Sequence, residues 1–462
     1  MEHPVADTES GRVQGVAEDG VAAFRGIPYA ASPVGEFRFA APQPPASWPG
    51  VRDASRSGPS VPQGPSRLEA VMGARAPDWD EDGCLTLNVW TPRLPASGPT
   101  PDGLPVLVWF HGGGFTSGSG GWDWYDGRNL AAAGGIVVVT ANYRLGPLGY
   151  LYLPELGIEN LGVQDQAAVL DWVGRNVATF GGNPGAVTVG GQSAGAYSAL
   201  YLALSPATGP HISQVISQSG PWGLPPQDPA EAAGHTRRFL EILGLAGGAG
   251  PGADLGAALR AVPAGQFLPA YRQLAQEVSR PGSAAPPLYP VRGAAGLPED
   301  WAAALAAGRL GGKPLLAGTT SDEMRAFFNF DPRIPGIAAG LGRSVDDFTQ
   351  TQTEILFRDG TLAIADHQAT ARHPAYVYEF GYTPDPDPGH LGGAHCCDLP
   401  FFFDTLGAYP GSPMLGQVTP AVRALAGTFS RAVAGFVATG RPADDRWHPY
   451  EPANPVTVRY FA

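Results

Sequence analysis

A series of short apolar runs, separated by stretches with helical periodicity, limits the folds open to this chain more than any other feature. The runs lie at residues 85–90, 106–110, 136–140, 187–189, 214–217, 314–317 and 375–380. Several are almost continuously apolar, which is typical of strands buried on both faces of a parallel sheet. Strands of this kind alternating with helices predict a doubly wound α/β fold with a large, mostly parallel central sheet.

The helical stretches have recognisable ends. Residues 163–178 carry an apolar stripe and precede Gly181, and a long final helix is expected between a Thr419 cap and Gly440, with Pro420 in its first turn. Residues 225–313 differ, being rich in Ala, Gly and Pro, with helical pieces at 235–245 and 301–307 and loops at 247–252 and 281–287. We interpret them as a helical subdomain inserted into a single domain spanning 1–462; a low-complexity linker is the alternative for the most Gly-rich parts.

Composition narrows the class of protein. Charged residues make up 15% of the 462 positions, and 29 basic against 42 acidic residues give a net charge of −13. No basic stripe is present, which argues against nucleic acid or an anionic membrane as the main partner. Three cysteines are too few for a disulfide framework, and neither a signal-peptide pattern nor an apolar run of ~18 residues is visible. These observations predict a protein of the cytoplasm.

The strongest local motif is Gly191-Gln192-Ser193-Ala194-Gly195. It follows an apolar strand and leads into a helical stretch at 197–204. Small residues on both sides of Ser193 allow a sharp strand-to-helix turn that exposes its hydroxyl, as a nucleophile requires. A Gly-rich turn with an ordinary hydroxyl is the alternative.

A serine nucleophile also needs donors for the developing oxyanion. His111-Gly112-Gly113-Gly114-Phe115 follows the strand at 106–110, and glycines let backbone N–H groups approach a substrate closely. A phosphate cradle would need a Lys followed by Ser or Thr, and Phe115-Thr116 supplies no Lys. With the N–H of Ala194, those of Gly113 and Gly114 would form an oxyanion hole.

The base and the acid remain open on these grounds. His390 and His395 both lie in or beside the Gly-rich loop 388–394, beyond the strand at 375–380. Asp322 and Glu323 both follow the strand at 314–317. The order Ser, acid, His favours these downstream residues, but the residue pattern does not choose within either pair.

The chain resembles the carboxylesterase type B family, which includes para-nitrobenzyl-type esterases, animal carboxylesterases and cholinesterases. The resemblance runs from about residue 8 to the C-terminus. It is carried by Phe24-Arg-Gly-Ile-Pro-Tyr-Ala30, Glu81-Asp-Gly-Cys-Leu-Thr-Leu-Asn-Val-Trp90, Val108-Trp-Phe-His-Gly-Gly-Gly-Phe115, Asn142-Tyr-Arg-Leu-Gly146, Asn160-Leu-Gly-Val-Gln-Asp-Gln166, Phe180-Gly-Gly-Asn-Pro184 and Gln218-Ser-Gly220.

The resemblance implies the α/β-hydrolase fold and hydrolysis of carboxylic esters through an acyl-enzyme. The family's acid and base match Glu323 and His395, which with Ser193 would form the triad. It also implies an oxyanion hole of Gly113, Gly114 and Ala194, and substrate pockets near Phe115, Trp222 and Phe327. It implies a small-molecule ester substrate and no metal or organic cofactor. An amidase or carbamate hydrolase with the same triad, or a non-catalytic binding member of the fold, are the alternatives.

Several positions depart from the family pattern. Gln192 replaces a common Glu beside the nucleophile, which weakens any preference for cationic, choline-like substrates. Met324 replaces a usual Gly, Cys396-Cys397 replaces a small or apolar pair, and Val61 replaces a loop cysteine of secreted relatives, so Cys84 is expected to stay reduced. Two further pairs, Arg38 with Glu81 and Arg144 with Asp165, are predicted to be structural ion pairs.

Overall fold

A large central sheet organises the molecule. The computed structural model describes residues 3–75, 78–95, 103–245, 254–280, 283–298 and 300–462. Among these residues the sheet has ten strands, in the spatial order β13-β12-β11-β10-β9-β7-β8-β6-β4-β3. The strands are β3 (Val16–Glu18), β4 (Val21–Pro28), β6 (Thr86–Thr91), β7 (Leu104–Phe110), β8 (Val137–Ala141), β9 (Gly182–Gln192), β10 (Gln214–Gln218), β11 (Leu315–Thr320), β12 (Ala375–Phe380) and β13 (Val458–Phe461).

Strand direction divides this sheet into two parts. From β13 to β8 every neighbouring pair is parallel, whereas β8, β6, β4 and β3 pair antiparallel. A second, small sheet contains β1 (Val5–Thr8), β2 (Gly11–Gln14) and β5 (Val51–Asp53). The mostly parallel sheet confirms the predicted fold class, and each predicted strand lies within or overlaps an observed one.

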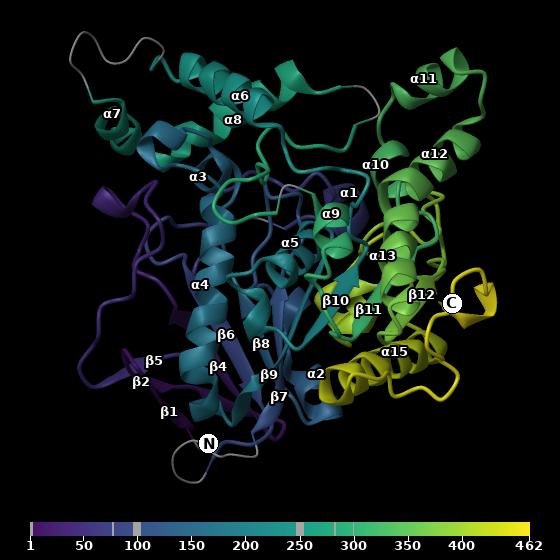
Figure 1. Ribbon diagram of the computed structural model, residues 1–462, viewed down its shortest axis with the longest axis horizontal. Coiled ribbons are helices and arrows are strands. Elements are labelled where there is room, and N and C mark those ends of the chain that lie inside the picture. Colours follow the sequence, from purple (N-terminus) through teal and green to yellow (C-terminus); the bar gives the residue numbers. More distant parts are fainter. Residues whose placement is uncertain (1–2, 76–77, 96–102, 246–253, 281–282, 299) are drawn as a thin grey trace.

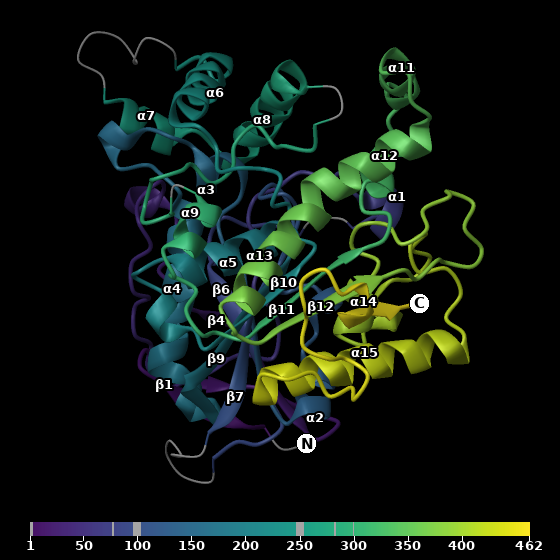
Figure 2. The ribbon, with the colours of Figure 1, turned by 45° about the vertical axis from the view of Figure 1, so that its right-hand side comes forward.

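Helices cover both faces of the sheet (Figure 1). The alternation of β7 shows why: Val108 and Phe110 belong to the core on one face, whereas Leu107 and Trp109 belong to the core on the other. The first core also contains residues of α4 (Leu161–Asn176), α5 (Ala194–Leu204) and α13 (Asp359–Thr370). The second contains residues of α2 (Arg128–Gly134) and α15 (Pro420–Thr439), which pack on each other (Figure 2). Two packed layers of helices therefore bury the apolar strands completely.

Both ends of the long last helix, α15, are as the sequence predicts. The Thr419 hydroxyl accepts a hydrogen bond from the backbone N–H of Val422 at 3.3 Å, and Gly440 ends α15 in the left-handed conformation with φ 76°. These are the N-cap and C-cap devices that Thr and Gly supply.

The segment 225–313 contains α6 (Pro229–Ile242), α7 (Leu255–Ala261), α8 (Ala264–Val278) and α9 (Trp301–Ala306). Helices α6, α7 and α8 lie together at one end of the molecule in both views (Figure 1, Figure 2). Helix α6 begins six residues before the predicted 235, because the Asp228 side chain caps it and Pro229 occupies its first position. The loop expected at 247–252 lies outside the described residues.

The remaining helices are short. They are α1 (Glu69–Met72), α3 (Gly146–Tyr150), α10 (Arg325–Phe328), α11 (Ile334–Gly340), α12 (Val345–Thr353) and α14 (Leu399–Phe402). None of the helices formed by the described residues combines the length and the hydrophobicity of a membrane-spanning segment.

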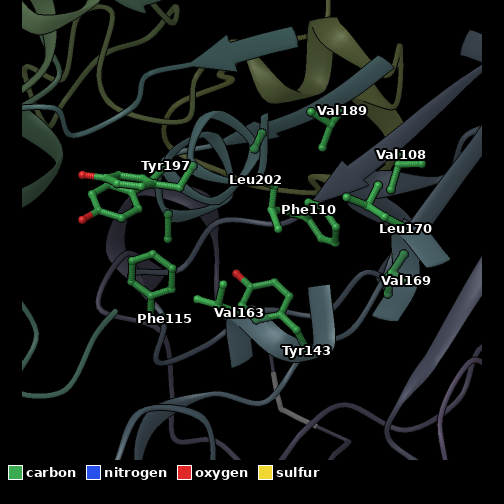
Figure 3. Packing of buried hydrophobic residues seen from close by; sticks show 14 of the residues in the cluster. Val108, Phe110, Phe115, Tyr143, Val163, Val169, Leu170, Val189, Tyr197 and Leu202 are labelled. Carbon is green, nitrogen blue, oxygen red and sulfur yellow. The ribbon is translucent and has the colours of Figure 1, made fainter. Parts of the chain in front are cut away.

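One part of the core joins the sheet to the loops at its edge (Figure 3). Phe115, just beyond β7, packs edge-to-face against Tyr197 of α5 at 5.8 Å and against Tyr150 at 5.2 Å between ring centroids. Edge-to-face contacts of this kind stabilise aromatic clusters beyond simple burial. The Gly-rich loop and α5 are thereby held against one core.

Candidate active site

The parallel strands deliver the candidate residues to one edge of the sheet. His111 to Gly114 follow β7, Ser193 follows β9, Glu323 follows β11, and His395 lies in the long connection after β12. The carboxyl ends of parallel strands share one edge, which is where open α/β sheets bind ligands.

Ser193 occupies a strained turn between β9 and α5. Its backbone has φ 55° and ψ −121°, a conformation that a residue with a Cβ rarely adopts. Its N–H donates to the Gln218 carbonyl at 2.9 Å, and its own carbonyl accepts from the N–H of Tyr197 at 3.0 Å. A Cβ on Gly195 would overlap the Phe110 carbonyl oxygen, so only glycine allows the helix to start this close to β7. The sharp strand-to-helix turn that the sequence predicts at Ser193 is present.

The Gly-rich loop after β7 also needs glycine. Gly113 and Gly114 have φ 115° and 60°, and a Cβ on Gly113 would overlap the Ser117 carbonyl oxygen. Among the hydrogen bonds of the described residues, the backbone N–H groups of Gly113, Gly114 and Ala194 donate to no protein acceptor. All three residues line the same cavity. Three free donors are therefore available to an oxygen atom bound there.

His111 fixes the start of this loop. Its ring stacks on Tyr143 with centroids 4.5 Å apart, and its Nδ1 contacts the Gly112 carbonyl oxygen at 2.7 Å. Burial lowers the pKa of His111 to about 4. The ring is therefore neutral at pH 7 and donates its Nδ1 proton to that carbonyl.

His395 and Glu323 form a completely buried pair. The Nδ1 atom of His395 is hydrogen-bonded to Oε2 of Glu323, and Oε1 of Glu323 accepts from the backbone N–H of Thr320 at 2.9 Å. Burial opposes protonation of the imidazole, but Cys396 and the Glu323 carboxylate favour it by more. The pKa of His395 is therefore raised above its ordinary value.

The second imidazole nitrogen faces Gln192. Nε2 of His395 lies 3.0 Å from the side-chain amide nitrogen of Gln192. Because Nδ1 carries a proton and donates it in the hydrogen bond to Glu323, Nε2 of the neutral imidazole is the acceptor of the bond from Gln192. Within the described part of the chain, the Ser193 hydroxyl forms no hydrogen bond with His395. Active-site hydrogen bonds of this kind often tighten only when substrate is bound.

The other two candidates left open by the residue pattern lie outside this pair. Asp322 binds Arg325 at 3.1 Å and the N–H of Gly393 at 3.1 Å. His390 has φ 50°, and its carbonyl accepts from Arg325 at 2.8 Å. Both residues brace the loop that carries His395 and do not contact its imidazole.

A cavity of about 290 Å³ opens in front of Ser193 and His395. Phe115 and Phe327 are among its lining residues, and the Phe327 ring lies 5.3 Å from the His395 ring. Trp222 does not line it; this ring is buried behind its neighbours Pro221 and Gly223 and stacks on Tyr197 at 5.8 Å.

Residue patterns missed much of this wall. The large apolar lining residues that were not predicted include Leu68, Met72, Trp122, Trp124, Tyr125, Leu224, Ile355, Leu356 and Phe357. They come from loops and short helices distant in sequence, and no motif distinguishes them from ordinary core residues.

The two predicted ion pairs are confirmed. The guanidinium of Arg144 donates to both carboxylate oxygens of Asp165, at 2.7 and 2.8 Å, and both side chains are almost fully buried. Arg38 binds Glu81 and also donates to the Arg260 carbonyl at 2.7 Å, which ties an N-terminal loop to α7. Cys84, Cys396 and Cys397 are all free and buried.

Comparison with known proteins agrees with the observed fold. The model of the carboxylesterase family matches residues 2–339 and 339–461. The chain is 35% identical to para-nitrobenzyl esterase of Bacillus subtilis (strain 168), over 97% of this chain and 93% of the relative. It is 34% identical to phenmedipham hydrolase of Pseudarthrobacter oxydans, over 98% and 94%.

Solved structures give the same result. A thermophilic PNB esterase superposes with a TM-score of 0.83 at 34% identity, over 97% of this chain and 94% of that one. A Geobacillus stearothermophilus carboxylesterase superposes with a TM-score of 0.79 at 33% identity, over 96% and 92%. Family, relatives and fold agree, and the chain therefore belongs to the carboxylesterase family and is an ester-hydrolysing enzyme.

Proposed function

We propose that the enzyme works through a Ser193, His395 and Glu323 triad, with the N–H groups of Gly113, Gly114 and Ala194 as the oxyanion hole. The observation that carries this proposal is the buried His395–Glu323 pair. His395 lines the same cavity as the strained turn at Ser193 and the three unpaired N–H donors, and Glu323 lies behind the imidazole. Nucleophile, base, orienting acid and oxyanion donors are the components of such a site.

The mechanism begins when the Ser193 oxygen attacks the ester carbonyl carbon and its proton moves to Nε2 of His395. The carbonyl oxygen becomes an oxyanion held by the three N–H groups, and each donor contributes ~10²–10³ in rate. His395 then gives the proton to the leaving alcohol, and the bond between the carbonyl carbon and that oxygen breaks. Water repeats the sequence on the acyl-enzyme, releasing the carboxylic acid and regenerating Ser193.

The hydrogen bond from the Gln192 amide to Nε2 of His395 must break before the first step. The amide proton occupies the Nε2 lone pair that has to accept the Ser193 proton. Substrate entry would therefore exchange one Nε2 partner for the other. In the exchange, Glu323 keeps Nδ1 protonated and the ring oriented.

The cavity wall favours a small ester with apolar groups. Phe115 and Phe327 are proposed to contact the substrate directly. Trp222 would contact it only if the adjacent residues Pro221 and Gly223, which line the cavity, move. An amide or carbamate substrate uses the same machinery and is the second outcome of the test below. The proposed mechanism uses no metal or organic cofactor.

The test is a series of p-nitrophenyl esters of increasing acyl length, with matched anilides and carbamates, on wild type and on Ser193→Ala. Turnover should be lost in Ser193→Ala and kept in Ser198→Ala, a control on the same helix whose hydroxyl donates to the Ala194 carbonyl at 3.1 Å. Wild-type-like turnover by a folded Ser193→Ala protein would refute the assignment. Faster cleavage of the anilides or carbamates than of the esters would change the proposed substrate class to amides or carbamates.

We also propose that residues 1–462 act as one domain with 225–313 as an insertion, and that the enzyme works in the cytoplasm. Three free, buried cysteines and no cysteine partner for Cys84 support a reducing compartment. Fractionation of cells that produce the natural protein tests the location, since recovery from an oxidising compartment would contradict it.

A further inference from the structure

The charges around the cavity are one-sided. Of the described residues that line it, none is Asp or Glu, and Arg67 is the one Arg or Lys. Glu323, the acid of the proposed triad, lies behind the imidazole of His395 and does not line the cavity. A ligand in the cavity therefore meets a cation with no facing carboxylate.

Arg67 stands beside the oxyanion glycines. A Cβ built on Gly114 would lie only 2.8 Å from Nη2 of Arg67. Its Nη1 donates to the Ala284 carbonyl at 3.0 Å, which holds the guanidinium across the cavity wall. Arg67 forms no salt bridge with an acid in the described part of the chain, so most of its five donors remain available.

Arg67 is also accessible to a ligand in the cavity. The residue is exposed and lines the cavity, together with the apolar residues Leu68, Met72 and Phe115. Nearby protein atoms desolvate its guanidinium in part, which lowers the pKa of Arg67. An anionic ligand bound there would gain a cation that no acid of the described residues already pairs with.

Gln192 contributes to the same imbalance. Gln192 stands where many members of the carboxylesterase family have Glu. Its neutral amide contacts His395 and lines the cavity. A carboxylate there would attract cationic substrates and oppose anionic ones. With the amide, none of the described residues that line the cavity carries a carboxylate beside the reacting groups.

We propose that this esterase selects esters that carry a carboxylate, and that Arg67 binds that carboxylate. The inference rests on the proposed function and adds the substrate class. The planar guanidinium suits a carboxylate because it donates two parallel hydrogen bonds, which a lysine ammonium cannot do. Arg67 is a specificity-determining residue in this account, and the triad chemistry is unchanged.

The test compares esters that differ only in a carboxylate or an isosteric carboxamide. One pair carries the group on the alcohol side, as 4-carboxyphenyl and 4-carbamoylphenyl butanoate. The other carries it on the acyl side, as mono(4-nitrophenyl) terephthalate and 4-nitrophenyl 4-carbamoylbenzoate. The measured quantity is the ratio of kcat/KM for the anionic ester to that for the neutral ester, in wild type and Arg67→Gln.

In at least one pair, Arg67→Gln should lower this ratio about tenfold or more, the effect of a lost hydrogen bond to a charged group. Arg280→Gln is the matched control: it removes the same charge from the chain just before the lining residues Ser283 to Pro286, at a side chain 80% exposed that does not line the cavity. Its ratio should stay within about twofold of wild type. The wild-type preference should also shrink with added salt, a measurement that needs no variant.

Equal ratios for Arg67→Gln and wild type in both pairs, with the neutral esters still cleaved, would overturn the role of Arg67. Failure of wild type to cleave any of the four esters would instead count against the proposed function. Binding separates the two outcomes: at least one of the two anionic esters should bind Ser193→Ala about tenfold or more tightly than it binds Ser193→Ala with Arg67→Gln. Equal affinities for both anionic esters in calorimetry would overturn the proposal even without turnover.

Discussion

Replacing Gln192 by Glu places a carboxylate against the atom of His395 that must accept a proton. The Gln192 amide nitrogen lies 3.0 Å from Nε2. A carboxylate there favours the imidazolium by both charge and hydrogen bonding. The base works only when neutral, so a raised pKa of His395 raises the pH below which activity is lost.

The size of the effect follows from this distance. At 3.0 Å, a unit charge changes the free energy of protonation by ~1.4 kcal/mol at the dielectric constant of water and ~5.5 kcal/mol at an effective value of 20. These energies correspond to about 1 to 4 pH units. Because burial also disfavours the new carboxylate, we expect an upward shift of at least ~1 unit.

The assay is the pH dependence of kcat/KM for p-nitrophenyl butanoate, followed at the isosbestic wavelength of the product. In wild type the acid limb should lie above the ordinary histidine pKa of ~6.5, because the pKa of His395 is raised. In Gln192→Glu the limb should move further up. Gln192→Met is the neutral control and should not move it up. An unmoved or lowered limb in Gln192→Glu would refute the proposed contact between residue 192 and the base.

Other expected outcomes concern the acid and the scaffold. Glu323→Gln should lower kcat by ~10²–10⁴ and shift the acid limb down, because the imidazole loses both its orienting partner and the charge that raises its pKa; an unchanged pH profile would exclude Glu323 as that partner. Asp165→Asn should reduce the free energy of unfolding by ~3–5 kcal/mol, because it leaves the Arg144 guanidinium buried without its counter-charge. Arg175→Gln, which breaks an exposed pair with Glu9, should cost at most ~1 kcal/mol in the same denaturation experiment. Similar losses in these two variants would contradict the reasoning from burial.

The central strands could be predicted from the sequence because burial on both faces leaves a continuous apolar run. Residues 375–380 were expected as a strand, and β12 has the same bounds. The short outer strands β1 and β2 were not predicted, since they mix exposed and buried residues over four positions each. Nothing in such a pattern separates them from loops.

The site shows the same division. The turn at Ser193 and the glycines at 113 and 114 could be located because their backbone conformations restrict residue type. The pairing of His395 with Glu323, in preference to His390 or Asp322, could be expected only from family resemblance. Arg67 and the contact of Gln192 with His395 depend on how loops pack across the sheet edge, which no local pattern encodes.

The most direct test of the proposed mechanism is the position of the covalent intermediate. A fluorophosphonate that mimics an ester should add once per chain, and peptide mass spectrometry should place the adduct on Ser193, with loss of esterase activity in proportion to labelling. An adduct on another residue, or full esterase activity in protein completely labelled at Ser193, would contradict the account.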